Sequence, residues 1–413
     1  MVSSTTLVAL GGLVLSFSGT ALAGFASYAQ NNIAVYWGQN SANRAGSQQR
    51  LGAYCSNTPV NIIPLAFLNN IKSPTLVNFA SASDSCTPFP GSQLLRCPEI
   101  EADILSCQSA GKTLLLSLGG ATYTEGGFSS PSEASAWADT IWAMFGPVSS
   151  SSGNRPFGGA VVDGFDFDFE AATQNMVPFA SRLRTLMDAE TARSGRRFFL
   201  AAAPQCPFPD LAMDSILESV PLDFVSVQFY NNYCGAAAAG GGNNFNFGTW
   251  DAWASARGNG VKVLLGVPGS PSAAGSGYVS APQLVAGVIA QARRYPSFGG
   301  VMVWDMSQLQ SNPGFLETIA AGLDSGSSSY TPPAPVVSSW APAPTTLITS
   351  TRTSSAYNVA TAASPAAQSP STSTTDHLVP QWGQCGGEGY TGSTTCQPPF
   401  TCVHESQWWA HCD

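Results

Sequence analysis

Apolar runs of seven to ten residues recur eight times along the chain, and stretches with helix-like patterning separate them. The runs occupy residues 32–38, 61–68, 113–120, 161–170, 197–204, 223–231, 261–268 and 299–306. Short runs that alternate with helical segments are typical of parallel βα units. Eight such units over about 300 residues predict an α/β fold, a (β/α)8 TIM barrel. An open doubly wound sheet is the competing architecture, but no GxGxxG motif follows any run to support it.

The runs share a second feature, because apolar residues come first and polar or aromatic residues follow at the C-terminal end. Examples are the endings "YWG" (residues 36–38), "FYN" (229–231) and "VWDM" (303–306). In a TIM barrel, the C-terminal ends of the strands form the active face. The pattern therefore places the candidate functional residues at one end of the barrel.

The run at residues 161–170 stands out, because carboxylates and phenylalanines alternate along it in a chain with only 10% charged residues. In a strand, side chains two residues apart share a face. One face carries the carboxyl groups of Asp166, Asp168 and Glu170. The other face carries the rings of Phe165, Phe167 and Phe169. A solvated calcium-type loop is the alternative, but such a loop has no reason to hold a phenylalanine at every second position.

Three carboxyl groups inside a barrel cannot all ionise, so we expect them to share protons and to titrate as a coupled set. Cleavage of a glycosidic bond needs one carboxylic acid that stays protonated near neutral pH, beside polar or negative groups that support a positive sugar centre. Glu170, the outermost and longest, is the natural acid. Asp163 lies an odd number of residues from Asp166, so it belongs to the other face of the strand, and it directly precedes Gly164. We therefore expect Asp163 to have a structural role.

The sequence resembles glycoside hydrolase family 18, and within it the class III, hevamine-like chitinases of plants and fungi. "DGFDFDFE" (residues 163–170) fits the DGxDxDxE signature of that family, and "LLLSLGG" (114–120) fits its SxGG strand. Further matches are "IAVYWGQN", "AFLN", "AAPQCPFPD", "VQFYNN" and "GGVMVWD". These motifs follow the family's order over the whole main domain.

The resemblance implies retaining, substrate-assisted hydrolysis of β-1,4-linked N-acetylglucosamine in chitin. By position, Glu170 would donate the proton to the scissile oxygen, and the 2-acetamido carbonyl of the sugar would act as the nucleophile. Asp168 would bind the acetamido N–H, with Asp166 behind it as its proton-sharing partner. Tyr230 would direct its hydroxyl at the acetamido carbonyl, and Gln228 would help to hold that group.

Trp304 would form the apolar floor under the reacting sugar, although an ordinary core tryptophan is the alternative. Tyr36 and Gln39, at the end of the first strand, are weaker candidates for substrate contacts. About 30 residues separate the last two runs, too few for the additional domain that deepens the cleft in other branches of the family. We therefore expect a shallow, open groove and cleavage at internal bonds.

The N-terminus has the pattern of a secretory signal peptide over residues 1–23. An apolar run from Leu7 to Phe17 is followed by Ala21, Leu22 and Ala23, a small-x-small cleavage pattern. A membrane anchor is the alternative, but spanning a bilayer takes about 20 apolar residues. We expect a secreted, extracellular protein with no membrane partner.

Charge and composition narrow the range of ligands. The formal net charge is −9 and the chain has three lysines, so it offers no basic surface for nucleic acid. All three histidines lie in the C-terminal tail, which leaves little from which to build a metal site in the main body. We expect a monomer that binds a neutral substrate and needs neither a metal nor a cofactor.

Composition changes sharply after the catalytic barrel, which we place at residues 24–324. Residues 325–378 are mostly Ser, Thr, Pro and Ala and predict an extended, O-glycosylated linker. Residues 379–413 resemble a family 1 carbohydrate-binding module. Its pattern assigns the flat sugar-binding face to Trp382, Trp408 and Trp409. Whether that face prefers chitin or cellulose stays open.

Ten cysteines in a secreted chain suggest disulfides. Spacing alone leaves 15 connectivities open for the six in the main domain. The two family resemblances imply five pairs: Cys55 with Cys107, Cys86 with Cys97, Cys206 with Cys234, Cys385 with Cys402, and Cys396 with Cys412.

Other functions on the same scaffold are a catalytically silent chitin-binding or inhibitor protein, an endo-β-N-acetylglucosaminidase that cuts N-glycans, and a cellulase. Silent relatives typically lack the acid or its neighbour, whereas Asp166, Asp168, Glu170 and Tyr230 are all present here. A cellulase fails on mechanism, because glucose has no 2-acetamido group to supply the nucleophile. An endochitinase is the leading hypothesis.

Overall fold

The computed structural model describes residues 24–150, 152–240, 244–325, 378–379, 384–386, 393–404 and 410–412. The chain divides into two compact units, Met1–Pro333 and Ala334–Asp413. The predicted leader at residues 1–23 and nearly all of the predicted linker lie outside the described residues. Within the described residues, no helix combines the length and the apolar character that crossing a bilayer requires.

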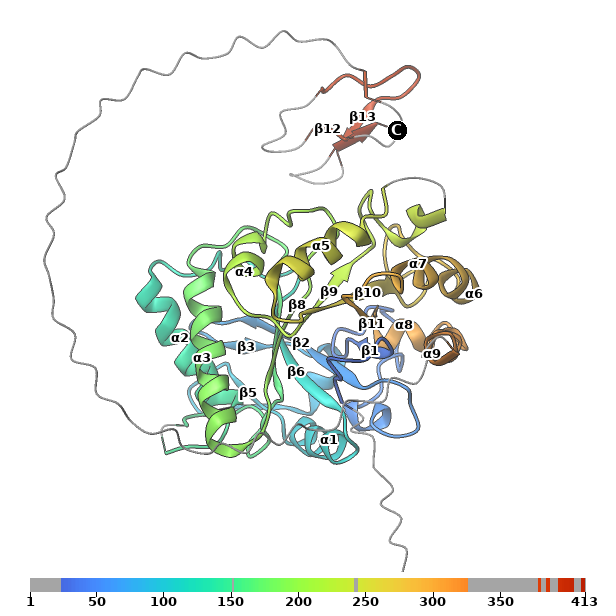
Figure 1. Ribbon diagram of the computed structural model, residues 1–413. Helices are drawn as coiled ribbons and strands as arrows, with labels where there is room; N and C mark the ends of the chain where they lie inside the picture. The colour runs from blue at the N-terminus through green and yellow to red at the C-terminus, as the bar shows by residue number, and fades with distance from the viewer. Residues whose placement is uncertain are drawn as a thin grey trace, which may run out of the picture. The chain divides into compact units, whose positions relative to one another are not determined.

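The first unit is a closed barrel of eight parallel strands, as the sequence predicted (Figure 1). The strands are β1 (Asn32–Val35), β2 (Ile62–Asn70), β6 (Thr113–Gly119), β7 (Gly164–Asp168), β8 (Phe199–Ala202), β9 (Phe224–Gln228), β10 (Lys262–Pro268) and β11 (Phe298–Trp304). Each falls within one of the eight predicted apolar runs, or overlaps its edge by one or two residues. Pairing of β1 with both β11 and β2 closes the barrel, and the short strand β3 (Leu76–Val77) joins β2 antiparallel.

Helices surround the barrel (Figure 1). They are α1 (Pro98–Ser109), α2 (Pro131–Phe145), α3 (Met176–Ser194), α4 (Asp214–Ser219), α5 (Phe247–Arg257), α6 (Ala281–Gln283), the π-helix η4 (Leu284–Ile289), α7 (Ala290–Ala292), α8 (Met306–Gln310) and α9 (Phe315–Ser325). Between β1 and β2 stands only the 3-10 turn η1 (Leu51–Tyr54). The elements between β10 and β11 are α6, η4 and α7, so no additional domain stands there, as the sequence predicted.

The remaining short elements lie in the connections. They are the 3-10 turns η2 (Ala80–Ser85) and η3 (Ala236–Gly240) and the hairpin of β4 (Thr87–Pro88) with β5 (Leu95–Arg96). The β4–β5 hairpin is closed at its base by the disulfide between Cys86 and Cys97.

The core has two layers, because successive side chains of a buried strand point to opposite faces. Phe165, Phe167 and Phe169 belong to the larger layer, which lies between the strands and the helices. A smaller layer fills the barrel interior and includes the side chains of Tyr36 and Met302. The alternation predicted for residues 165–169 is therefore confirmed.

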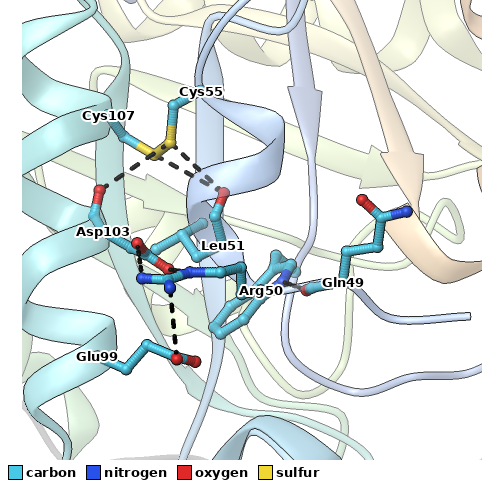
Figure 2. Close-up of polar contacts among 8 residues, drawn as sticks. Gln49, Arg50, Leu51, Cys55, Glu99, Asp103 and Cys107 are labelled. Carbon is cyan, nitrogen blue, oxygen red and sulfur yellow. Dashed lines mark hydrogen bonds and ion pairs between the residues drawn. A yellow bond between two sulfur atoms is a disulfide. The ribbon is translucent and has the colours of Figure 1, made fainter. Parts of the chain in front are cut away.

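A polar brace fixes the turn η1 against α1 (Figure 2). Figure 2 shows the disulfide between Cys55 and Cys107, which joins the two elements. Beside it, Arg50 donates from Nε and Nη2 to the two carboxylate oxygens of Asp103 at 3.0 and 2.6 Å, and its Nη1 lies 3.5 Å from Glu99. A fork-to-fork pair of this kind fixes orientation as well as distance. The disulfide and the arginine contacts thus tie the short turn to α1.

All five disulfides implied by the family resemblances are present, and none of the ten cysteines is free. In the second unit, β12 (Gln384–Gly386), β14 (Ala410–Cys412) and β13 (Cys402–His404) form an antiparallel sheet. Its two disulfides supply the stabilisation that so small a core cannot. Trp382, Trp408 and Trp409, the predicted sugar-binding face, lie outside the described residues.

Candidate active site

The carboxyl groups of β7 meet polar side chains from neighbouring strands inside the barrel. Asp166 is 1% exposed and accepts hydrogen bonds from the hydroxyls of Tyr36 at 2.6 Å and Ser117 at 2.7 Å. Asp168 is 4% exposed, and its Oδ1 accepts from Nε2 of Gln228 at 2.9 Å. Among the described residues, the hydrogen bonds to both carboxyls come from the neutral side chains of Tyr36, Ser117 and Gln228, which compensate in part for the loss of water.

The position of Glu170 differs from the prediction. The strand β7 ends at Asp168, so Glu170 lies two residues beyond it, and the side chain of Glu170 is exposed. The pairing of β6 with β7 ends at Gly119 and Asp168, and the N–H of Gly120 then bonds the Asp168 carbonyl at 2.7 Å. Gly119 has φ +113°, and a Cβ there would stand 2.4 Å from that carbonyl oxygen. Only glycine allows this close approach. Glu170 therefore stands at the rim, open to a substrate.

Partial or complete loss of water raises the pKa of all three acids. It raises the pKa of Asp166 to about 6, although the hydrogen bonds from Tyr36 and Ser117 act in the opposite direction. The pKa of Asp168 lies well above its ordinary value, first through burial and then through the charges of Glu170 and Asp166. Glu170 as a whole is exposed, but the protein around its carboxyl group removes part of the water; this desolvation, followed by the charge of Asp210, raises its pKa, while a hydrogen bond from Gln228 acts in the opposite direction. These directions follow the expected proton sharing and favour Glu170 as a protonated acid.

Asp210 is the functional candidate that sequence reasoning missed. It follows β8, is 4% exposed and accepts from the backbone N–H groups of Gln205 at 2.6 Å, Ala212 at 2.8 Å and Met213 at 2.9 Å. Three backbone donors fix this carboxylate beside Glu170 without a counter-cation. The one available signal was a Pro-Asp pair at the end of "PQCPFPD", which is typical of an Asx turn.

Tyr230 and Gln228 lie at the end of β9. Nε2 of Gln228 donates to Asp168 and to the carbonyl of Ala203, both at 2.9 Å. Tyr230 is 7% exposed, and burial, followed by the charges of Asp168 and Glu170, raises its pKa well above the ordinary value. Its hydroxyl thus stays protonated and able to donate.

Trp304 ends β11 and is partly exposed. Its ring stacks on Phe67 with centroids 6.0 Å apart and tilts against Tyr36 at 5.5 Å. These rings hold one indole face in place at the upper end of the barrel, as a sugar-binding floor requires.

Tyr36 lies deeper than a substrate contact requires, whereas Gln39 is half-buried and stays a candidate. Tyr36 is 2% exposed and its hydroxyl donates to Asp166, because its inward-facing position on the first strand lies in the layer below the open site. Nε2 of Gln39 donates to the carbonyls of Ala66 and Asn78, both at 2.9 Å. Tyr36 therefore supports the carboxyl ladder from within the barrel, and Gln39 is held in place by its amide nitrogen.

Asp163 makes structural contacts, as its place on the other face of the segment from Asp166 predicted. It accepts hydrogen bonds from Nε2 of Gln108 at 3.0 Å, the N–H of Leu114 at 2.9 Å and Nη2 of Arg196 at 2.7 Å. These contacts tie the start of β7 to neighbouring elements on the outside of the barrel.

Comparison with known families gives two matches. The model for glycosyl hydrolases family 18 matches residues 32–277, more than half of the chain. The chain belongs to glycosyl hydrolase family 18. In this family 18 hydrolase, residues 381–409 also match the fungal cellulose binding domain.

Curated relatives cover most of the family 18 hydrolase. Endochitinase 33 of Trichoderma harzianum is 51% identical over 322 residues, which are 76% of this chain and 97% of that protein. The class III chitinase of Arthroderma benhamiae is 46% identical over 321 residues, 75% of this chain and 90% of that protein.

Solved structures similar to this family 18 hydrolase include proteins with different activities. ICChI chitinase from Ipomoea carnea is 29% identical with a TM-score of 0.58, and covers 71% of this chain and 100% of that one. A xylanase and α-amylase inhibitor protein from Scadoxus multiflorus is also 29% identical with a TM-score of 0.58, at 70% and 98% coverage. Since one barrel carries both an enzyme and an inhibitor, the side chains of the site must decide between them.

Proposed function

We propose that this protein is an endochitinase, which hydrolyses internal β-1,4-N-acetylglucosaminide bonds of chitin with retention of configuration and with Glu170 as the proton donor. The observation that carries the proposal is the ladder of Asp166, Asp168 and Glu170, which runs from the barrel interior to its open rim. Similarity to proteins named endochitinase and chitinase supports the same substrate.

The first step uses the raised pKa of Glu170. Its proton passes to the glycosidic oxygen, while the 2-acetamido carbonyl oxygen attacks the anomeric carbon and the bond to the leaving sugar breaks. The product is a cyclic oxazolinium ion. Asp168 accepts a hydrogen bond from the acetamido N–H and balances the positive charge, and Tyr230 donates its hydroxyl to the acetamido oxygen.

The second step reverses the roles. Glu170, now a carboxylate, takes a proton from water, and the water oxygen attacks the anomeric carbon and reopens the ring. Two inversions at one carbon give net retention. Asp166 shares a proton with Asp168, and Tyr36 and Ser117 hold it in place for this exchange. Gln228 fixes Asp168, and Trp304 supports the sugar from below.

Of two alternative functions on this scaffold, the residues of the site disfavour one, an inhibitor, and do not separate the other. An inhibitor needs no acid catalyst, so buried carboxyl groups without a charged partner would lower its stability and bring it no benefit. An endo-β-N-acetylglucosaminidase uses the same ladder but takes an N-glycan as substrate, so only assays on both substrates separate the two.

We further propose that residues 1–23 are a secretory leader and that the mature protein acts outside the cell as a monomer. Residues 325–378 would be a linker that tethers the barrel of residues 24–324 to the module of residues 379–413. A module that binds chitin or cellulose raises the local concentration of the enzyme at a solid surface. Five disulfides fit an oxidising compartment.

The stereochemistry of the first product tests the proposed reaction. We expect NMR to show the β-anomer as the initial product from the N-acetylglucosamine hexamer. The β-1,4-linked glucose hexamer lacks the acetamido group and should not be cleaved. High-mannose glycoprotein should remain intact in the same assay. An initial α-anomer, or cleavage of the glucose hexamer at a similar rate, would refute the mechanism.

The replacement Asp210→Asn should shift the pH profile. A negative charge at position 210 raises the pKa of Glu170, so removing the charge lowers that pKa and the acid loses its proton at lower pH. We expect the alkaline limb of kcat/KM to move down by up to about one pH unit. A purely structural role for Asp210 predicts instead a uniform loss of rate with both limbs in place, alongside a lower melting temperature.

A further inference from the structure

We propose that Asp305 is a positioning residue, which holds Trp304 in place as the floor of the substrate site by clamping the loop after β1 to the helix α8. The inference rests on the proposed function, because it depends on Trp304 as a contact of the reacting sugar. It assigns a task to a carboxylate outside the acid ladder.

The first observation is the place of Asp305 in the fold. Asp305 directly follows Trp304, the last residue of β11, and directly precedes α8. Its side chain is 1% exposed, and among the described residues the hydrogen bonds to its carboxyl come from neutral donors. Burying a carboxyl group without a charged partner costs stability, and serine or asparagine would cap a helix without that cost. The carboxyl group therefore does more than begin α8.

The second observation is that the two carboxylate oxygens of Asp305 have different tasks. Oδ1 accepts from the N–H of Gln308 at 3.1 Å and from the hydroxyl of Ser307 at 2.6 Å, both in α8. Oδ2 accepts from the N–H of Ser41 at 3.2 Å, in the loop after β1. The hydroxyl oxygen of Ser307 adds a second link to that loop, because it accepts from the N–H of Ala42 at 3.1 Å. A side chain with two acceptor oxygens can thus bridge two segments.

The third observation is that α8 is itself fixed. Gln308 is fully buried, and its Oε1 accepts from the hydroxyls of Ser270 at 2.5 Å and Ser272 at 2.9 Å, in the loop after β10. The N–H of Gly269, in the same loop, donates to the carbonyl of Trp304 at 2.7 Å. In the barrel, β11 lies between β10 and β1. The backbone of Trp304 is therefore held from the β10 side directly, and from the β1 side through the residue that follows it.

These contacts lie beside the proposed reaction. The charge of Asp305 contributes to the raised pKa of Tyr230, after burial and the charges of Asp168 and Glu170. The clamp thus stands close to the hydroxyl that would bind the acetamido group of the sugar. Because a misplacement of about 1 Å can cost an enzyme much of its rate, a floor under that sugar needs a fixed backbone. Loss of the clamp should let Trp304 shift and weaken its contact with the substrate.

The replacement Asp305→Asn separates the clamp from the helix cap. An amide has one acceptor oxygen, so it can cap α8 or bond the N–H of Ser41, but not both. In the full-length protein we expect KM for the N-acetylglucosamine hexamer to rise about tenfold and kcat to stay within about threefold, because the sugar contact weakens while the acid ladder is unchanged. A merely structural role would reduce the folded fraction instead, which lowers kcat and the melting temperature but leaves KM in place.

Two further variants support this test. Ser307→Ala removes the link to Ala42 and leaves Ser41 on Oδ2 of Asp305, so KM should rise by a smaller factor, about threefold. This variant decides the matter if Asp305→Asn folds poorly. Ser130→Ala is the matched control, because the hydroxyl of Ser130 caps α2, a helix that contributes no residue to the proposed site. It should lower the melting temperature and leave KM unchanged.

A double-mutant cycle tests whether Asp305 acts through Trp304. In the Trp304→Ala background, Asp305→Asn should lower kcat/KM by less than about twofold, because the floor is already lost. An unchanged KM in both Asp305→Asn and Ser307→Ala, or an equal loss of kcat/KM with and without Trp304, would overturn the inference. Failure of the proposed function would look different, since the unmodified protein would then not cleave the hexamer.

Discussion

Replacement of Glu170 by glutamine is expected to reduce kcat on the N-acetylglucosamine hexamer by about a thousandfold to ten-thousandfold. Glutamine keeps the size and hydrogen-bonding capacity of the side chain but cannot donate a proton to the leaving oxygen or accept one from water. Glu170 is exposed and pairs with no basic side chain in the described part of the chain, so the fold should not change. Initial rates, with binding of the hexamer measured by calorimetry, provide the test.

The Glu170→Gln variant should still bind the hexamer with an affinity close to that of the unmodified protein. Glu170→Asp serves as the matched control, because it keeps the carboxyl group and moves it away from the bond by one methylene. We expect Glu170→Asp to retain more activity than Glu170→Gln. Undiminished turnover by Glu170→Gln would assign the proton donor to another residue and remove the basis of the mechanism.

Replacement of Asp168 by asparagine is expected to lower kcat about a hundredfold, because the charge that balances the oxazolinium ion is lost. An asparagine Oδ1 can still accept from Gln228, so the local geometry should persist. In the protein without substrate, the raised pKa of Asp168 favours its protonated form, so its ionisation costs stability as pH rises above the pKa of the unfolded chain. The variant should therefore melt at the same temperature as the unmodified protein at pH 7, or higher.

Asp163→Asn is the matched control for Asp168→Asn, since both change one aspartate of the same segment to its amide. Asp163 pairs with Arg196 and bonds the backbone of Leu114, away from the open site. Its replacement should lower the melting temperature and leave kcat unchanged, the opposite pattern. If Asp168→Asn destabilised the protein without a fall in kcat, Asp168 would have a structural role only.

The strands and the division of β7 into two faces were predictable because both follow from local periodicity. A strand fixes the direction of each side chain, so Asp166 and Phe167 had to point to opposite layers. The motifs identified the family through the same short segments. These features depend on residues that are neighbours in sequence.

The rest of the site depends on contacts that no local pattern encodes. Tyr36 was expected at the substrate, but its hydroxyl reaches Asp166 across 130 positions of sequence. Asp210 acts through its proximity to Glu170, and nothing in its own neighbours reveals that. Glu170 lies beyond β7, because the pairing of β6 with β7 stops at Gly119 and Asp168. Each of these contacts joins residues that become neighbours only when the barrel closes.

The alternation along β7 makes this segment intolerant of changes in length. Inserting or deleting one residue between Asp163 and Phe165 would exchange the two faces of the strand, so phenylalanines would enter the barrel and carboxylates would lie under the helices. The substitutions at Asp168 and Asp163 are expected to lower activity and stability separately, whereas a shift of register should remove both together. Divergence among relatives of this barrel should therefore spare the length of this segment, even where the enzyme has become an inhibitor and its acids are no longer needed.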